Sequence, residues 1–445
     1  MVQPQPPESD SRKTISQKLA TSNLYRVFSY SDFRLLWIGA FLSFTGSWVQ
    51  NVAQGYFVYQ LTGDESKLGF VSFCSSVPVF IFGFVAGTLA DAFNKRTVLI
   101  IAQAIFAAGA LYLAVATQYR FVQYWQIVTV SFLLGLVSCV EMPSRQSIVS
   151  RVVPPEELGA AVPVNAMTFN VARIFGPALG GILLAHFGVA MCYFLNGISF
   201  LALIWAALAI KADLSSRHRE PQPIRDLLME GFLYTMRDHR LRTLFILETV
   251  TAGFGLAYLP LLPAFVHQVL GIVGEEQAKK ALGTAFTAVG VGAFSGLLLV
   301  SQYNESHRKA GIIRGAMWAI GFGLVALSVA HNPFYAYPLL AVLGAAAVAQ
   351  LNTTNALFQL MSPERLRGRV LAMHIWALNG FSPFGVLFFG WLANKTRTDH
   401  HLLITGSSYT LSSYGVTLSM QIGGVCVLFG ALAATLSKRG LSGLA

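Results

Sequence analysis

Residues 161–210 read AVPVNAMTFNVARIFGPALGGILLAHFGVAMCYFLNGISFLALIWAALAI and contain Arg173 as their one residue among Asp, Glu, Lys and Arg. A stretch this long and apolar is enough for two passes through a bilayer, since one helical pass takes about twenty residues. Backbone polar groups cannot stay unpaired in lipid, and spanning strands would be nearer ten residues with strict alternation. The stretch therefore predicts two membrane-spanning helices joined by a short turn.

The rest of the chain has the same character. Hydrophobic residues make up 54% of its 445 residues and charged residues 11%, whereas a soluble globular chain carries roughly 25% charged residues. So few charges cannot cover a soluble surface. We predict an all-α membrane protein with twelve transmembrane helices, at about 35–60, 68–90, 97–118, 122–143, 161–186, 189–210, 243–269, 282–302, 312–331, 334–360, 370–393 and 411–437.

The longest polar interruption, residues 211–242, divides these segments into two sets of six. From Ile224 to Asp238 it mixes apolar residues with charges, which is typical of an amphipathic helix at a membrane surface. The expected organisation is a cytoplasmic N-terminal tail (1–32), a six-helix bundle (33–210), a cytoplasmic linker (211–242), a second six-helix bundle (243–437) and a cytoplasmic tail (438–445).

Loop sequences repeat between the two sets. VVPPEELGAAV follows segment four and LMSPERLRGRV follows segment ten, so that Pro155 lies 208 residues before Pro363. The basic pair at 95–96 lies 213 residues before the pair at 308–309. Offsets that agree this well indicate two pseudo-symmetric halves of like orientation, related by an axis along the membrane normal and enclosing a cavity.

Lysine and arginine are distributed unequally between the two sides of the predicted membrane. With the N-terminus inside, 24 of the 31 lie on the cytoplasmic side and 6 on the other, with Arg173 inside a segment. Such an excess marks the cytoplasmic side. Both termini are therefore expected in the cytoplasm, and the net charge of +11 reflects topology and attraction to anionic lipid rather than binding of nucleic acid.

Residues 87–96, GTLADAFNKR, are similar to the loop signature G-x-x-x-D-R-x-G-R-R/K of the major facilitator superfamily. Ala92 and Asn94 replace its usual arginine and glycine. A carboxylate at a helix end can accept hydrogen bonds from a neighbouring helix N-terminus and latch the halves in one state; the alternative is a merely solvated charged turn. The matching positions, and candidates for the latch, are Gly87, Asp91, Lys95 and Arg96.

Longer stretches resemble the bacterial efflux branch of that superfamily, which contains the enterobactin exporter. They are residues 33–63, 143–181 and 261–271, and the resemblance runs from about Asp32 to the last helix. It implies a secondary exporter of small amphipathic molecules, of drug or siderophore type, working by alternating access in the bacterial inner membrane. It further implies protons as the coupling ion, no cofactor and a monomer.

Within 143–181, the run Gly176-Pro177-Ala-Leu-Gly180-Gly181 is similar to the tail of the helix-five motif associated with exporters. Pro163 and Ala172 replace the upstream glycines, so half of that motif is present. Small residues let two helices approach closely, and proline frees a carbonyl that permits a bend. The run is thus either part of the conformational latch or a site of tight helix packing.

Arg173 lies about twelve residues into its segment, or about 18 Å along the helix. A charge at that depth costs roughly 3 kcal/mol or more and should face a cavity or a partner. We expect contact with substrate or a role in gating; the alternative is a structural pairing with carbonyls near Pro177.

Segment one carries Ser47, Gln50 and Gln54 on one helical face, with Asn51 adjacent. In the major facilitator architecture this stripe would line the cavity, whereas the alternative is hydrogen bonding that holds helices together.

Two glutamates, Glu141 and Glu248, lie toward the cytoplasmic ends of segments four and seven. Together they form either an acidic mouth for cationic substrates or two ordinary pairs, Glu141 with Arg145 and Glu248 with Arg242 or another base. No carboxylate lies at the centre of a segment. Candidates for proton coupling are therefore restricted to Glu141, Glu248, Asp91 and His374.

The sequence contains no recognisable nucleophile–base set, phosphate-binding loop or metal-ligand cluster, so we expect neither an enzyme nor a metal site. Two rival functions stay open. One is a lysophospholipid flippase or importer of the same fold, and the other is a membrane sensor that does not transport. A sensor would usually carry a sizeable cytoplasmic output domain, for which these loops are short.

Overall fold

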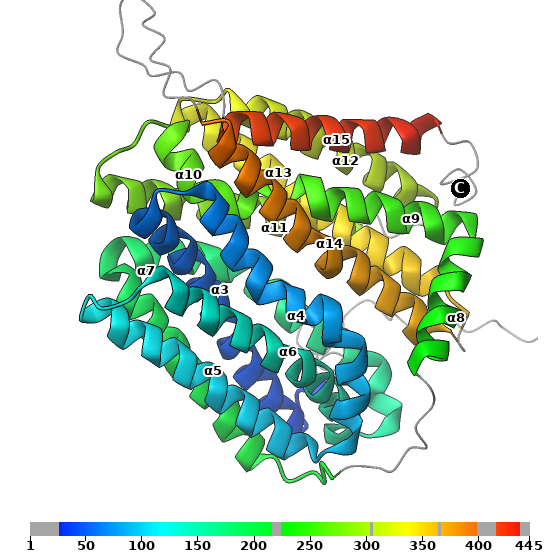
Figure 1. The fold of residues 1–445 in the computed structure, drawn as a ribbon. Coiled ribbons are helices and arrows are strands. Elements are labelled where there is room, and N and C mark those ends of the chain that lie inside the picture. The colour runs from blue at the N-terminus through cyan, green and yellow to red at the C-terminus, as the bar shows by residue number, and fades with distance from the viewer. Residues whose placement is uncertain (1–25, 216–223, 303–305, 364–365, 398–414, 437–445) are drawn as a thin grey trace, which may run out of the picture.

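The computed structural model describes residues 26–215, 224–302, 306–363, 366–397 and 415–436, of which 83–92, 224–228, 301–302, 306–308 and 367 are described by backbone alone. Over these ranges every regular element is a helix, so the all-α prediction is confirmed (Figure 1). In chain order they are α3 (Ser31–Thr62), α4 (Glu65–Ala92), α5 (Lys95–Gln118), α6 (Tyr124–Val152), the short η1 (Pro155–Glu157), α7 (Leu158–Ala209), α8 (Ile224–Arg237), α9 (His239–Val250), η2 (Thr251–Gly255), α10 (Tyr258–Gln268), α11 (Glu275–Gln302), α12 (Ser306–Ser328), α13 (Pro333–Met361), α14 (Arg367–Lys395) and α15 (Val416–Leu436).

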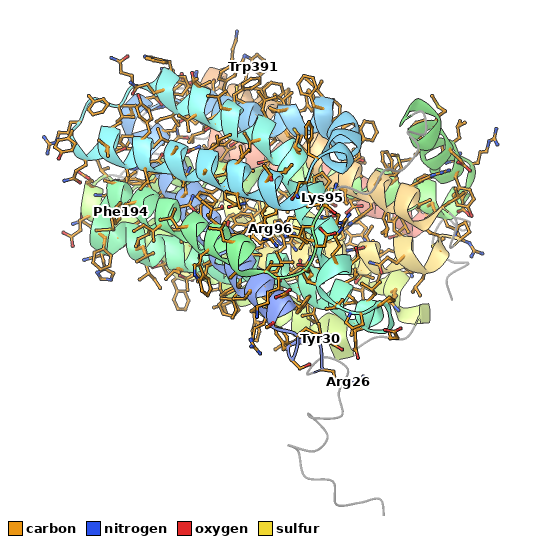
Figure 2. The ribbon with its side chains drawn as sticks, turned by 90° about the horizontal axis from the view of Figure 1, so that it is seen from below. Arg26, Tyr30, Lys95, Arg96, Phe194 and Trp391 are labelled. Atoms are coloured by element: carbon orange, nitrogen blue, oxygen red, sulfur yellow. The ribbon has the colours of Figure 1, made fainter. Side chains whose placement is uncertain are left out.

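Ten helical stretches in the described residues are long and apolar enough to cross a membrane. One of these ten stretches, Pro155–Ala209, contains two of the predicted segments. The 32-residue helix α3 is not among the ten, since its polar residues lower its mean hydropathy. With α3 added and the long stretch counted twice, the helices match the twelve predicted from the sequence. Large apolar side chains such as Phe194 and Trp391 point outward from the bundle, as contact with lipid requires (Figure 2).

The predicted turn between 161–186 and 189–210 is made by one residue. Gly188 has φ 76° and ψ −179°, inside an otherwise continuous α7. A Cβ added to Gly176 would lie 2.4 Å from the Cβ of Trp48, and one added to Gly46 would lie 2.9 Å from the Cβ of Ser199. Because positions on both sides of Gly188 meet neighbouring turns of α3, the chain reverses there. Glycine suits the position since a side chain would be strained at this φ.

The seventh predicted segment is interrupted. Between α9 and α10 the five residues of η2 form a π turn, and the Leu256 amide donates to the Thr251 carbonyl at 3.0 Å. The sequence pattern predicts a single uninterrupted helix over 243–269. A π turn holds one more residue than an α turn and often marks a functional position.

The predicted amphipathic helix of the linker coincides with α8, which packs on α9 and α14 (Figure 1). Glu230 of α8 forms an ion pair with Arg369 of α14. The contact ties the linker helix to the second half of the chain.

The two halves meet where helix backbones almost touch. On one side α7 crosses α11, and a Cβ added to Gly181 would lie 2.3 Å from the Cα of Gly283. On the other side α4 crosses α14, and a Cβ added to Gly390 would lie 3.2 Å from the Cα of Gly69. Gly69 precedes Gly283 by 214 residues and Gly181 precedes Gly390 by 209. These separations match the two sequence offsets, 213 and 208, within one residue, so the two crossings are equivalents in the internal repeat.

We predict that Gly181→Ala and Gly283→Ala each destabilise the folded protein by about 1–3 kcal/mol, because the added methyl group meets backbone that cannot move aside. The measurement is the melting temperature of purified protein in detergent. Gly315→Ala is the matched control: it also lies in a helix, nothing lies within 4 Å of its added Cβ, and it should be neutral or stabilising by up to about 1 kcal/mol. Equal melting temperatures for all three variants would show that the helices at the crossing can move apart to accommodate the methyl group.

Candidate functional site

Arg173 lies on α7 beside the contact between the halves. Its neighbour Ile174 packs against Ala293 of α11 and Val348 of α13, and a Cβ on Gly290 would lie 2.7 Å from the Ile174 carbonyl oxygen. The Arg173 guanidinium donates to the Asn170 side chain at 3.1 Å. Among the described side chains it forms no ion pair.

The polar stripe of α3 is mostly occupied within the first half. Gln50 is buried and accepts a 2.7 Å hydrogen bond from Asn196 of α7, and Gln54 donates to Ser131 of α6 at 3.1 Å. Both contacts fit the alternative in which these side chains hold helices together.

Asn51 differs from its neighbours, because its side chain is exposed. It lies one turn before Gly55, whose added Cβ would face Pro263 of α10 at 3.7 Å. Asn51 is therefore on the face of α3 turned toward the second half, where a cavity residue belongs.

Glu141 belongs to a closed network inside the first half. Its Oε1 accepts from Arg145 Nε at 3.0 Å and from Gln103 Nε2 at 3.1 Å. Gln103 accepts in turn from Ser43 at 3.3 Å, and the Arg145 guanidinium lies 4.3 Å from the centre of the Phe44 ring. All four polar residues are buried. The predicted Glu141–Arg145 pair is present.

Glu248 is fully buried in the second half, and its Oε2 lies 2.7 Å from His374 Nδ1 on α14. The sequence suggests Arg242 or another base as its partner. Arg242 instead donates to the Met236 carbonyl at 3.3 Å. Since Glu141 and Glu248 each point into a different half, they do not form a shared acidic mouth in this structure.

The basic pair that follows α4 binds within one half. The Lys95 amide donates to the Leu214 carbonyl at 3.0 Å, and Arg96 donates to the carbonyls of Ile210 and Ala212 at 2.5 and 3.1 Å. Figure 2 labels Lys95 and Arg96 at the start of α5. Asn94, a departure from the family signature, caps α5 by accepting from the Arg96 amide at 2.9 Å. The side chain of Asp91 and the surroundings of Gly87 lie outside the described residues, so the latch stays a prediction.

The glycines of the helix-five run have different neighbours. Gly176 faces Trp48, and a Cβ on Gly180 would lie 2.9 Å from the Cα of Val49, both on α3. Pro177 is buried beside them. Gly181 alone of this run faces the other half, at Gly283. Tight packing therefore accounts for the first three positions, and Gly181 contributes to the crossing.

A polar cluster at the end of the bundle opposite Lys95 and Arg96 was not predicted from the sequence. Glu65, fully buried at the start of α4, accepts from Tyr59 at 3.3 Å and from Gln268 of α10, and lies 3.6 Å from Arg397. Arg397 also donates to the Gly63 carbonyl at 2.9 Å. We call these residues the Glu65 cluster. It joins both halves at the end of the molecule that the charge count assigns to the outside. Gln268 and Arg397 are more than 200 residues from Tyr59 and Glu65, and the four share no motif, so sequence reasoning could not bring them together.

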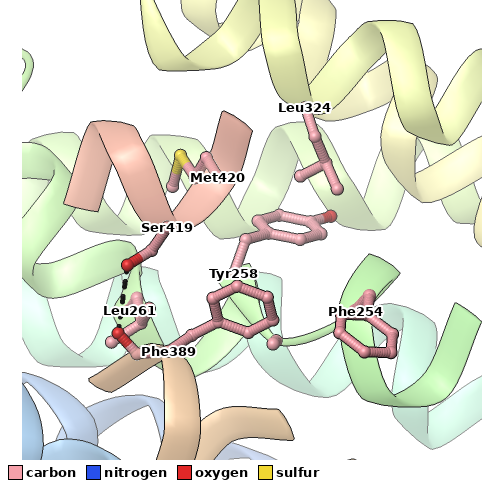
Figure 3. A pocket seen from close by; sticks show the side chains of 8 residues that line it. Phe254, Tyr258, Leu261, Leu324, Phe389, Ser419 and Met420 are labelled. Atoms are coloured by element: carbon pink, nitrogen blue, oxygen red, sulfur yellow. Dashed lines mark hydrogen bonds between the residues drawn. The ribbon is translucent and has the colours of Figure 1, made fainter. Parts of the chain in front are cut away.

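Two of the hollows among the described residues lie near groups discussed above or within one half. One, of about 230 Å³, adjoins the Glu65 cluster and is lined by Tyr56, Tyr59, Gln60, His267, Val273 and Glu275. The other lies inside the second half, where Tyr258 projects between Leu324 and Met420 and Ser419 donates to the Phe389 carbonyl at 3.1 Å (Figure 3). Its volume of about 10 Å³ suits at most one water molecule. No group of metal-binding side chains is present in the described part of the chain.

Comparison with known proteins identifies a family over most of the chain. The family model described as a transmembrane secretion effector matches residues 23–423. The staphyloferrin A transporter of Staphylococcus aureus is 26% identical over 78% of this chain and 86% of its own length. Macrolide efflux protein A of Streptococcus pyogenes is 20% identical over 84% and 92%, and the multidrug efflux pump Tap of Mycolicibacterium fortuitum is 21% identical over 81% and 88%.

Solved structures of transporters share the fold. The nucleoside transporter NupG superposes with a TM-score of 0.66 at 13% identity, covering 91% of this chain and 98% of that one. A bacterial homologue of the lysosomal transporter Spinster, in an inward-facing and unoccupied conformation, superposes with a TM-score of 0.66 at 14% identity, covering 93% and 97%.

The Glu141 network predicts a strong coupling between two residues. Glu141→Gln leaves the buried Arg145 charge without its carboxylate and should destabilise the protein by about 3–5 kcal/mol. The double variant Glu141→Gln with Arg145→Met removes both charges and should recover much of that loss. A double-mutant cycle on denaturation midpoints measures the coupling. Additive effects would mean that the pair contributes nothing beyond its separate side chains.

Proposed function

Since the chain belongs to the transmembrane secretion effector family of the major facilitator superfamily, we propose that it is a proton-driven exporter of small amphipathic molecules, of drug or siderophore type. Two rocking halves present the transport site alternately to the two sides of the membrane. The efflux functions in the names of the macrolide and Tap relatives support export, and the staphyloferrin A relative supports siderophore-type cargo.

The observation that carries the proposal is the position of Arg173. The guanidinium is held by Asn170 alone among the described side chains and lies next to the Ile174–Gly290 contact between the halves. A half-buried charge without a carboxylate partner is costly. An amphipathic molecule with an oxygen acceptor would relieve that cost and would bind most strongly in the state that best exposes Arg173 to it. Such differential binding is what a ligand needs to shift a conformational equilibrium.

The Glu65 cluster fits the second requirement of alternating access, a closure at one end. It bridges α3 and α4 to α10 and the end of α14 by hydrogen bonds and an ion pair. With the Glu65 end on the outside, as the charge count predicts, these contacts hold the outer side closed in this conformation. Breaking the cluster then opens the outer side. We further propose that the protein acts as a monomer in the bacterial inner membrane with both termini in the cytoplasm.

The test is transport in proteoliposomes carrying a pH gradient, with ethidium and erythromycin as probes and a fluorescent lysophospholipid as the competing substrate. Uphill movement of either drug, opposite to the proton gradient, is the expected result. Movement of the lipid alone would make the protein a flippase, and movement of no probe under any gradient would favour a sensor.

Variants of Arg173 sharpen this test. Arg173→Lys should lower drug flux about tenfold or more, equivalent to roughly 1.4 kcal/mol, because lysine lacks the planar fork of donors. Arg173→Met should abolish flux while keeping or raising the melting temperature, since it removes a half-buried charge that has no carboxylate partner among the described side chains. Arg151→Lys, at a partly exposed arginine near the end of α6, is the control and should transport normally. If both Arg173 variants melt much lower and lysine restores full flux, Arg173 is a structural clamp.

A further inference from the structure

The Glu248–His374 pair is incompletely satisfied. The two side chains are 0% and 8% exposed, and Glu248 Oε2 lies 2.7 Å from His374 Nδ1. The second carboxyl oxygen, Oε1, has no hydrogen-bond partner among the described residues. A buried acceptor without a partner costs about 1–3 kcal/mol. The unpaired oxygen leaves Glu248 able to hold a proton without losing a hydrogen bond at that atom.

The basic partner distinguishes this pair from Glu141–Arg145. Arginine stays charged in proteins, so Glu141 is held in one permanent ion pair. Histidine gains and loses a proton near neutral pH. Of these two buried glutamates, Glu248 is therefore the one whose partner can exchange a proton.

Among the described side chains, no fixed charge forms an ion pair with Glu248. The helices α13 and α15 contain no acidic or basic residue. On α8 and α14, Glu230 and Arg369 pair with each other. The remaining described charges on elements packed against α9 and α14 are Arg237 on α8, Asp238, His239, Arg240 and Arg242 at the start of α9, His267 on α10, Glu65 and Lys67 at the far end of α4, and Lys395 and Arg397 at the end of α14. A carboxylate buried with a neutral imidazole thus carries one unbalanced charge, which a single bound proton removes.

Glu248 lies close to the π turn η2, and His374 lies close to a contact between α14 and the first half. Glu248 comes three residues before Thr251, the first residue of the π turn η2, and Thr251 donates to Gln350 of α13 at 3.0 Å. Conversion of a π turn to an α turn shifts the helix register by one residue, about 100° of rotation. His374 is two residues from Trp376, whose ring stacks on Phe80 of the first half at 5.7 Å. A change of register at η2 would separate Glu248 from His374. On α14, His374 is two residues from Trp376, which contacts the first half.

We infer that Glu248 and His374 together form the proton-binding site that couples transport to the proton gradient, an inference that rests on the proposed transport function. In the outward-open state the pair, as carboxylate and neutral imidazole, takes one proton from the outer solution and becomes neutral. After the halves rock, the same proton leaves to the cytoplasm, and the pair returns to its starting charge. One proton enters as one substrate leaves, and no bond changes other than the N–H or O–H bond to that proton.

The first test needs no substrate. Infrared difference spectra of the purified protein, recorded between acid and alkaline pH, should contain a carboxyl or carboxylate band that is lost in Glu248→Gln and displaced in His374→Gln. Glu276→Gln, an exposed glutamate paired with Lys280, should leave that band unchanged. Spectra of Glu248→Gln identical to wild type would overturn the inference, whether or not the protein transports any probe.

The second test separates coupling from movement. In proteoliposomes, Glu248→Gln should lose pH-driven uphill accumulation of ethidium but keep ethidium exchange between equal concentrations, because glutamine mimics the neutral carboxyl. Its melting temperature should match or exceed that of wild type. Retained pH-driven accumulation in both Glu248→Gln and His374→Gln would overturn the inference while leaving the proposed export function intact. Failure of the wild-type protein to move ethidium would count against that function instead, and the infrared result would still decide the proton site.

Discussion

Two close contacts between helix backbones set the geometry of this protein. At Gly181–Gly283 and at Gly69–Gly390, the halves approach so closely that even a methyl group meets backbone atoms. Lipid supplies no hydrophobic drive for helices to associate, so such contacts depend on small residues and close packing. Because the internal repeat relates the two crossings, they lie on opposite sides of the pseudo-symmetric pair. Two such close contacts suit the pivoting of the halves that we propose.

The polar residues inside the bundle divide according to that interface. Gln50, Gln54 and Glu141 form hydrogen bonds within the first half, and each has a buried or part-buried partner there. The contacts of Gln50 and Gln54 link helices of the first half to one another. Asn51 and Arg173 instead lie along the interface between the halves, and the Glu65 cluster joins the halves at one end of it. We therefore assign substrate contact to the interface between the halves, proton binding to the second half and closure to the Glu65 cluster.

Local features could be predicted from the sequence. Apolar length indicated the helices, the charge pattern indicated α8, and the i,i+4 spacing of Glu141 and Arg145 was enough to anticipate their pair. The agreement between the two loop offsets indicated an internal repeat, and the sequence separations of the glycines at the crossings match it. The pairs that matter most for mechanism were beyond reach, since Glu248 and His374 are 126 residues apart and Glu65 and Gln268 are 203 apart. Pairing over such separations depends on how the helices pack, which no local pattern encodes. The π turn was missed for a related reason: its residues are as apolar as the helix on either side.

The proposed transport cycle requires the two halves to rock about the glycine crossings as rigid bodies. Distances between spin labels test this motion directly. One pair of labels at Ser150 and Leu360 spans the halves at the end carrying Lys95, and another at Tyr119 and Phe334 spans them at the Glu65 end; all four residues are exposed. Pulsed electron resonance in lipid nanodiscs, at acid and alkaline pH with and without ethidium, gives both distance distributions. We predict that one distance lengthens as the other shortens, while distances within each half stay constant. Distances that lengthen or shorten together, or that stay fixed under all conditions, would contradict the account.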